Sequence, residues 1–242
     1  MIQSTVKNAQ QLIQPWTHWF LYGDSGSGKT LAASTFPRPV FLVPQNEGSI
    51  TSLRGRDVPY YEIVDMGSAL VSGRGGMLRV LDELEAMYAE DPNTFPYDTV
   101  VVESLSHYCD LVTEELTGGG IRPMDQFRWG QLSSHLRTIQ VRLRRLDVHA
   151  VFTSLARTTT ADDGTVIGDA MIPGQSSIKL PAACDVIGYC EVTTSKNNPV
   201  HRIHFRRHKH FIARSRFDGL PATIDNFSFQ QVETLLQVAP SV

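Results

Sequence analysis

The sequence predicts an α/β protein with a mostly parallel sheet, flanked by helices and finished by antiparallel strands at the C-terminal end. Three observations support this fold class. Short apolar runs of the kind found in buried strands alternate with segments whose apolar residues recur at helical spacing. A loop of small residues joins the first strand to the first helix. From about residue 184 onward the chain changes to closely spaced strands with tight turns. With 242 residues, it is long enough for one domain over 1–242 with a full core.

The N-terminus lacks a basic segment followed by an apolar stretch, and no run approaches the roughly 18 apolar residues that a membrane span needs. We therefore expect a cytoplasmic protein that has no membrane partner. The three cysteines, Cys109, Cys184 and Cys190, form no C-x-x-C pair. We interpret all three as buried thiols.

The first element is an apolar strand from Trp16 to Tyr22, and a glycine-rich loop follows it. The loop fits the pattern G-x-x-x-x-G-K-[ST] through Gly23, Asp24, Ser25, Gly26, Ser27, Gly28, Lys29 and Thr30. Glycines let successive backbone N–H groups turn inward around phosphate oxygens. Lys29 would reach the β- and γ-phosphates, Thr30 would place its hydroxyl on Mg²⁺, and a helix starting near Lys29 would point its positive end at the anion. The loop predicts a nucleotide triphosphate site; the alternative is a glycine-rich turn without a ligand.

Two later strands end in carboxylates. Val40 to Val43 forms a short apolar run, and Glu47 follows it, where a carboxylate could orient or deprotonate an attacking water. Alternatively, Glu47 is a solvated loop residue. Thr99 to Val102 is an unbroken β-branched run that ends at Glu103, which can hold Mg²⁺ through its water shell. The alternative for Glu103 is an ordinary glutamate at a strand end.

Helices are expected where apolar residues recur from Met77 to Tyr88 and from Trp129 to Leu146, and a further buried strand from Val148 to Thr153. The segment 156–177 is rich in Thr, Asp, Gly and Ser, which predicts a mobile polar loop with a short hairpin around Asp163-Gly164. The segments "CDVIGYCEVTT", "PVHRIHFRRH" and "HFIARS" are then expected to be strands.

Charge is unevenly distributed along the chain. The net formal charge is −3, but residues 192–217 hold seven Lys or Arg, four His and no Asp or Glu, so the remainder carries −10. Phe205 and Phe211 are interleaved with these cations, a composition that suits single-stranded nucleic acid because bases stack on aromatic rings. The alternative is a solvated or subunit-facing strand surface.

With these motifs in this order, nearly the whole chain resembles the RecA superfamily of P-loop ATPases. More specifically, it resembles the small phage-encoded RecA-like ATPases implicated in single-strand annealing. The resemblance implies a RecA-like P-loop core that uses ATP and Mg²⁺, with Glu47 in "VPQNEGS" as the catalytic glutamate and Lys29 in the reaction site. It also places Glu103 in "VVVES" at the end of the Walker B strand, where aspartate is usual. Ser154-Leu155 stands where RecA proteins carry Asn-Gln, a departure that removes the glutamine side chain.

The resemblance also implies DNA and subunit contacts. Segment 156–177 falls where RecA-like proteins place a DNA-binding loop, and Arg214 and Arg216 in "FIARSRFDGLP" are candidates to reach a neighbouring subunit's nucleotide. Otherwise these two arginines pair with acidic residues of their own subunit. Our candidates for contact with DNA are Arg157, Lys179, Arg206, Arg207 and Lys209.

The favoured function is a Mg²⁺-dependent ATPase stimulated by single-stranded DNA, which acts in phage-type recombination or annealing as a homo-oligomeric ring or filament. Its place would be the host cytoplasm if a phage encodes it. The first alternative is an ATPase switch or loader for a single-strand-binding or other replication protein, and it shares every site residue. A small-molecule kinase is less favoured because segment 156–177 contains only Arg157 as an arginine for a phosphate-closing lid.

Overall fold

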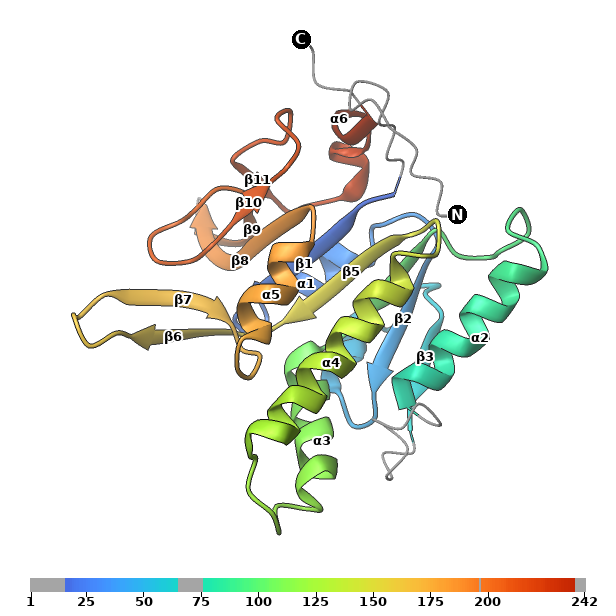
Figure 1. Cartoon of the computed structure of the whole chain (residues 1–242). Coiled ribbons are helices and arrows are strands. Elements are labelled where there is room, and N and C mark those ends of the chain that lie inside the picture. The colour runs from blue at the N-terminus through green and yellow to red at the C-terminus, as the bar shows by residue number, and fades with distance from the viewer. Residues whose placement is uncertain (1–15, 65–75, 196, 238–242) are drawn as a thin grey trace, which may run out of the picture.

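The computed structural model describes residues 16–64, 76–195 and 197–237 (Figure 1). Its strands are β1 (His18–Gly23), β2 (Pro39–Pro44), β3 (Tyr60–Ile63), β4 (Thr99–Val102), β5 (His149–Ser154), β6 (Ala156–Thr160), β7 (Val166–Ala170), β8 (Val186–Ser195), β9 (Asn198–His204), β10 (Arg214–Ser215) and β11 (Thr223–Asp225). Its α-helices are α1 (Lys29–Ala33), α2 (Gly76–Glu90), α3 (Leu105–Thr117), α4 (Gln126–Leu143), α5 (Ser176–Ala183) and α6 (Glu233–Gln237), and two 3₁₀ helices are η2 (Gly48–Leu53) and η3 (Phe229–Gln231).

One large sheet has the strand order β11-β9-β8-β1-β5-β4-β2-β3, and β10 pairs with β8. The strands from β8 to β3 in this order are parallel, whereas β9, β10 and β11 pair antiparallel. The central strands β1, β4 and β5 are buried throughout, as their unbroken apolar runs predict. The predicted fold class, a mostly parallel sheet with an antiparallel C-terminal end, is confirmed.

The side chains of β1 alternate between two hydrophobic layers. Phe20 and Tyr22 pack with the apolar residues of α2, α3 and α4, which lie together on one face of the sheet (Figure 1). Trp19 and Leu21 pack instead with α1 and with the aromatic residues around Phe229 near the C-terminus. The sheet is therefore covered on both faces.

The parallel register brings four strand ends to one edge. Tyr22 pairs with Ser154, and Val102 pairs with both Leu42 and Phe152. The residues that follow β1, β2, β4 and β5 therefore meet at the carboxyl edge of the sheet, where α/β proteins place their ligands.

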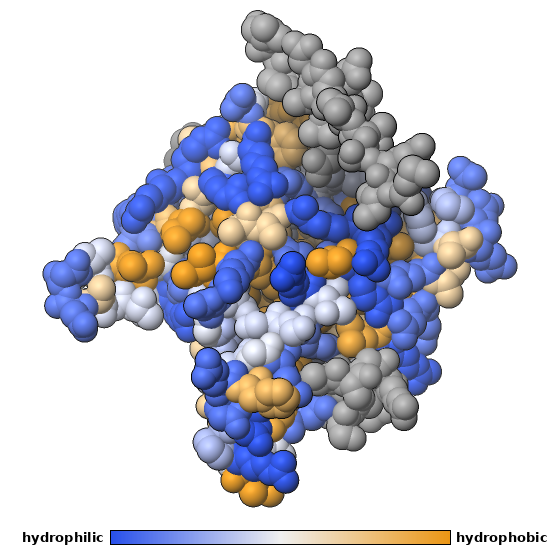
Figure 2. Space-filling model, viewed as in Figure 1, coloured by the Kyte–Doolittle hydropathy of each residue, from blue (hydrophilic) through white to orange (hydrophobic). Residues whose placement is uncertain are grey.

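The segment expected to be a polar loop forms the β6–β7 hairpin and the start of α5. The predicted turn is confirmed, since Gly164 has φ +81° and Asp163 Oδ1 accepts a hydrogen bond of 2.9 Å from the Thr165 amide. Residues 158–167 are exposed, and the hairpin projects from the body with a hydrophilic tip (Figures 1 and 2). The mobility of this segment remains a prediction.

The three cysteines are free and buried, as predicted. Within the described ranges, no helix combines the length and the apolar character that crossing a bilayer requires.

Candidate functional site

The glycine-rich loop joins β1 to α1, as its sequence predicts. Gly23 ends β1 and pairs with Cys190, and a Cβ atom added at Gly23 would lie 2.0 Å from the Cys190 carbonyl oxygen. Gly28, directly before α1, has φ +89°, a left-handed conformation that favours glycine. The backbone therefore needs glycine at both ends of the loop, and the loop opens at the carboxyl edge of the sheet.

Lys29 lies inside this loop. Its Nζ donates hydrogen bonds to the carbonyl oxygens of Gly23, at 2.9 Å, and Asp24, at 2.8 Å. Burial lowers the pKa of Lys29, and nearby groups that include Cys190 and Glu103 oppose that shift. The ammonium is thus held where a phosphate in the loop would contact it.

Thr30 and Glu103 are in direct contact. The Thr30 hydroxyl donates to Glu103 Oε1 at 2.8 Å, and the Thr153 hydroxyl donates to Oε2 at 2.9 Å. Glu103 is only 1% exposed, and burial raises its pKa despite these bonds. A hydroxyl beside a carboxylate offers oxygen ligands, which Mg²⁺ prefers. The residues present therefore fit the predicted Mg²⁺ site.

Glu47 follows β2 and caps the N-terminus of η2, where its Oε1 accepts a hydrogen bond of 3.1 Å from the Ser49 amide. It lines a cavity of about 460 Å³ together with Lys29, Thr30 and Glu103. Of the loop residues, Ser25, Gly26 and Gly28 also line this cavity. The phosphate loop after β1, Glu47 after β2 and Glu103 after β4 therefore line one cavity, as predicted.

Three titratable residues of this cavity were missed from the sequence: His107, Asp110 and His201. His107 Nε2 lies 3.1 Å from the Gln45 carbonyl oxygen, and desolvation raises the pKa of Asp110. His107 and Asp110 are three residues apart in the segment that directly follows Glu103, and this spacing, which puts both on one face of α3, is the signal that could have found them. His201 comes from β9, and its position depends on strand pairing.

At the end of β5, backbone and serine contacts replace a glutamine side chain. The Leu155 amide donates to Ser106 Oγ at 2.9 Å, and the Oγ atoms of Ser106 and Ser154 lie 3.0 Å apart. Leu155 lines the cavity. A hydroxyl chain therefore links α3 to the segment that leads into the β6–β7 hairpin.

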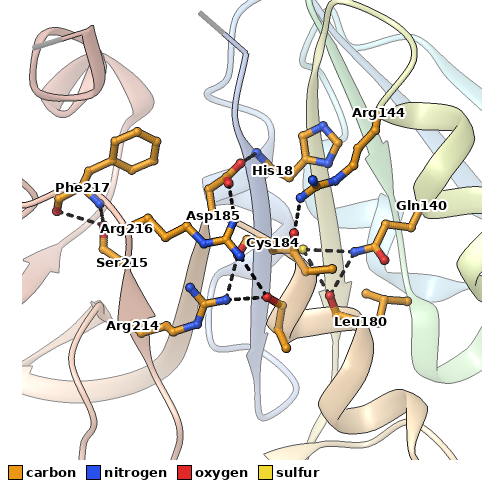
Figure 3. Close-up of polar contacts among 12 residues, drawn as sticks. His18, Gln140, Arg144, Leu180, Cys184, Asp185, Arg214, Ser215, Arg216 and Phe217 are labelled. Atoms are coloured by element: carbon orange, nitrogen blue, oxygen red, sulfur yellow. Dashed lines mark hydrogen bonds and ion pairs between the residues drawn. The ribbon is translucent and has the colours of Figure 1, made fainter. Parts of the chain in front are cut away.

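Arg214 and Arg216 lie at the other edge of the sheet, beside the start of β8 (Figure 3). Their guanidinium groups converge on the Ala182 carbonyl oxygen, at 2.7 Å and 3.3 Å. Arg214 also donates to the Cys184 carbonyl oxygen at 3.0 Å, and Arg216 to Asp185 Oδ1 at 3.0 Å. Within one chain both arginines stabilise the turn between α5 and β8; a role toward a neighbouring subunit remains a prediction.

The predicted DNA contacts are not all on one element. Arg157 on β6 donates to Asp169 on β7 at 2.8 Å, and Lys179 is exposed on α5. Arg206, Arg207 and Lys209 are exposed in residues 205–211, which we name the basic turn. The turn contacts the hairpin, since the Gly168 amide donates to the His210 carbonyl oxygen at 2.9 Å.

Three details of the basic stretch were predicted wrongly. Of the strand expected over "HFIARS", only Arg214–Ser215 forms a strand. The strand expected to reach His208 ends at His204, and the chain bends at residues 205–206. Phe205 is fully buried, and Phe211 stacks on Tyr189 with ring centroids 3.8 Å apart, so neither ring is free for a base. The stretch can attract nucleic acid through its charge, not through these rings.

The comparison with protein families agrees with this geometry. A family model described as an AAA domain matches residues 17–217. No curated protein matches the chain. Among solved structures, the chain is similar to a KaiC-like protein from the hyperthermophilic archaeon Pyrococcus horikoshii OT3, with 11% identity, a TM-score of 0.46, and coverage of 82% of this chain and 81% of that one. Since the family match includes the phosphate loop and both strand-end carboxylates, the chain belongs to the AAA domain family and is a P-loop ATPase domain.

Proposed function

We propose that the domain hydrolyses ATP with Mg²⁺ as cofactor and Glu47 as the general base, and that single-stranded DNA stimulates the reaction. The observation that carries the ATPase part is the Thr30–Glu103 hydrogen bond at the wall of the cavity that Lys29 and Glu47 also line. Lys29 would bind the phosphates, while Thr30 and Glu103 would hold the metal ion. Mg²⁺ would neutralise the charge that develops on the phosphates.

Glu47 fits the role of general base because it is half-buried at the carboxyl edge of the sheet and, among the described residues, only its Oε1 accepts a hydrogen bond. A carboxylate at this place can accept a proton from a water beside the γ-phosphate. The Ser49 amide fixes the orientation of the side chain through Oε1.

The DNA part of the proposal rests on charge and placement. Arg206, Arg207 and Lys209 are exposed on a turn that contacts the β6–β7 hairpin, and the hairpin continues from the end of β5 in the cavity wall. A change at the cavity wall on nucleotide binding would therefore be passed through the β6–β7 hairpin to the exposed cations of the basic turn. Oligomers in a ring or filament would align these surfaces along one strand, for recombination or annealing.

The test compares ATP turnover with single-stranded DNA, with duplex DNA and without DNA. We expect single strands to raise turnover, and Arg206→Ala/Arg207→Ala to lose that increase while it keeps the basal rate. Two lost phosphate contacts should also flatten the slope of log K against log salt by about 1.4 for single strands. The control is Arg79→Ala/Arg145→Ala, which removes the same charge from exposed positions elsewhere.

If DNA does not change the rate of ATP turnover and the protein does not bind DNA, the DNA part of the proposal is wrong. The ATPase part is not affected by that result. That result would favour a nucleotide switch or loader that acts on a replication protein. Turnover absent under every condition would contradict the ATPase part itself.

A further inference from the structure

Away from the nucleotide cavity, two histidines and a glutamate meet on one face of the antiparallel end of the sheet. Glu191 lies on β8, His204 ends β9, and His208 lies in the basic turn. One ligand atom from each of the three lies within 4.8 Å of the other two. We propose that these residues bind a divalent transition-metal ion of the Zn²⁺ class, which fastens the basic turn to the sheet.

Glu191 Oε1 and His204 Nε2 form a hydrogen bond, and the two distances from Oε1 to the histidines lie on either side of the separation expected for ligands of one ion. Glu191 Oε1 is 2.8 Å from His204 Nε2 and 3.9 Å from His208 Nε2. Two ligands of a tetrahedral ion, each about 2.1 Å from it, lie about 3.4 Å apart. The rings of His204 and His208 stack with an angle of 24° between their planes, so the His208 ring must turn out of this stack before both Nε2 atoms can face one ion. Two imidazoles and one carboxylate suit Zn²⁺ and leave a fourth position open.

One of the three ligand atoms, His208 Nε2, neither accepts nor donates a hydrogen bond among the surrounding described residues. It is buried, and this is a costly state for a nitrogen that can bind a metal ion. Arg202, opposite Glu191 in the β8–β9 ladder, instead donates to both carboxylate oxygens of Asp225, at 2.6 Å and 2.9 Å. Glu191 is thus left facing the two histidines.

The backbone that carries the three ligands is already held in place by the sheet and the basic turn. His204 is 5% exposed on the sheet, and its ring stacks on that of His208 with centroids 3.9 Å apart. Two backbone hydrogen bonds between His208 and Phe211 close the turn. A backbone that is ordered before the ion binds lowers the ordering cost of binding.

A metal ion here would act on the turn that supports the hairpin. The Gly168 amide donates to the His210 carbonyl oxygen, and a Cβ atom at Gly168 would lie 2.3 Å from the Phe211 ring. Because the hairpin packs this closely on the turn, an ion that fixes His208 would also steady the hairpin. This inference does not depend on DNA binding, and none of the three ligands lines the nucleotide cavity.

The test uses the purified full chain after chelator treatment, with Mg²⁺ in excess to saturate the Thr30–Glu103 site. Co²⁺ is titrated while visible absorption is recorded, and Zn²⁺ is then added as competitor. We expect one Co²⁺ per chain, displaced by Zn²⁺. His208→Ala should bind at least ~10²-fold more weakly, since even the loss of an outer partner of a ligand costs about 10–100-fold.

His210→Ala is the matched control, because it removes a histidine from the same turn that is not one of the three ligands. It should bind Co²⁺ like the unmodified chain, and Zn²⁺ should raise the Tm of both proteins but not that of His208→Ala. The proposal is overturned if the unmodified chain binds no Co²⁺, or if His208→Ala binds it as tightly as His210→Ala does.

Discussion

Gly28→Ala should destabilise the nucleotide-free protein through two separate effects. The backbone of Gly28 has φ +89°, and the added Cβ atom would lie 2.9 Å from both Cγ and Nδ1 of the His201 ring. His201 belongs to β9, so the substitution tests whether the antiparallel end of the sheet packs on the phosphate loop.

The magnitude can be worked from these two effects. A residue with a side chain in the left-handed region costs roughly 1–2 kcal/mol. Crowding against the imidazole adds about 1–3 kcal/mol, the usual cost of overpacking. Gly28→Ala should therefore cost about 2–5 kcal/mol of the free energy of unfolding. Gly26→Ala is the matched control: its φ is +76°, but a Cβ atom there meets nothing within 4 Å, so only the backbone cost of roughly 1–2 kcal/mol applies.

The assay is urea unfolding without nucleotide, in a double-mutant cycle that adds His201→Ala. We expect Gly28 and His201 to be coupled, so that the cost of Gly28→Ala falls toward that of Gly26→Ala once the imidazole is gone and only the His201 Cβ atom, at 3.1 Å, still contacts the new methyl group. Equal costs for the two glycine variants while His201 is present would refute the packing of β9 on the phosphate loop.

The remaining predictions concern the reaction site and the subunit contact. Lys29→Ala should weaken ATP binding and remove hydrolysis, since the positive charge that contacts the phosphates is lost. Unchanged turnover in this variant would count against the proposed site. Because burial raises the Glu103 pKa in the folded chain, its carboxylate costs stability once the pH exceeds the ordinary value of 4.5. Glu103→Gln should therefore gain stability relative to the unmodified chain between pH 4 and pH 8 in urea unfolding, and a difference that stays constant with pH would contradict this. If Arg214 and Arg216 act on a neighbour, mixing Lys29→Ala with Arg214→Ala/Arg216→Ala should restore part of the turnover that each lacks alone. If the subunits exchange and turnover is not restored, the two arginines do not act on a neighbouring subunit, and their role is to stabilise the α5–β8 turn.

The sequence was most informative where one physical requirement dominates. The run Thr99–Val102 must be a buried strand because it is β-branched throughout, and its bounds were predicted as observed. The phosphate loop was recognisable because close backbone packing at Gly23 and a left-handed backbone at Gly28 both favour glycine. Glu47 and Glu103 were found because parallel strands bring their carboxyl ends to one edge.

What failed depends on contacts between distant segments. Neither the helix that carries His107 nor the short strand Tyr60–Ile63 was predicted, since each depends on tertiary packing more than on a long periodic pattern. His201 could not be placed because the register between β8 and β9 decides whether its ring lines the nucleotide cavity, and the sequence does not reveal that register. The aromatic residues of the basic stretch were misread because Phe205 and Phe211 lie in a turn, where contacts with distant residues such as Tyr189 decide which rings are buried.

The central claim is that this cavity hydrolyses ATP with Glu47 as general base. Its most direct test measures phosphate release and ATP affinity with Mg²⁺ for the unmodified chain, Glu47→Gln, and the control Glu62→Gln at an exposed position on β3. We expect Glu47→Gln to bind ATP normally and to release phosphate at least ~10²-fold more slowly, with Glu62→Gln unaffected. Turnover by Glu47→Gln at the unmodified rate, or an equal loss of binding and hydrolysis, would contradict the claim.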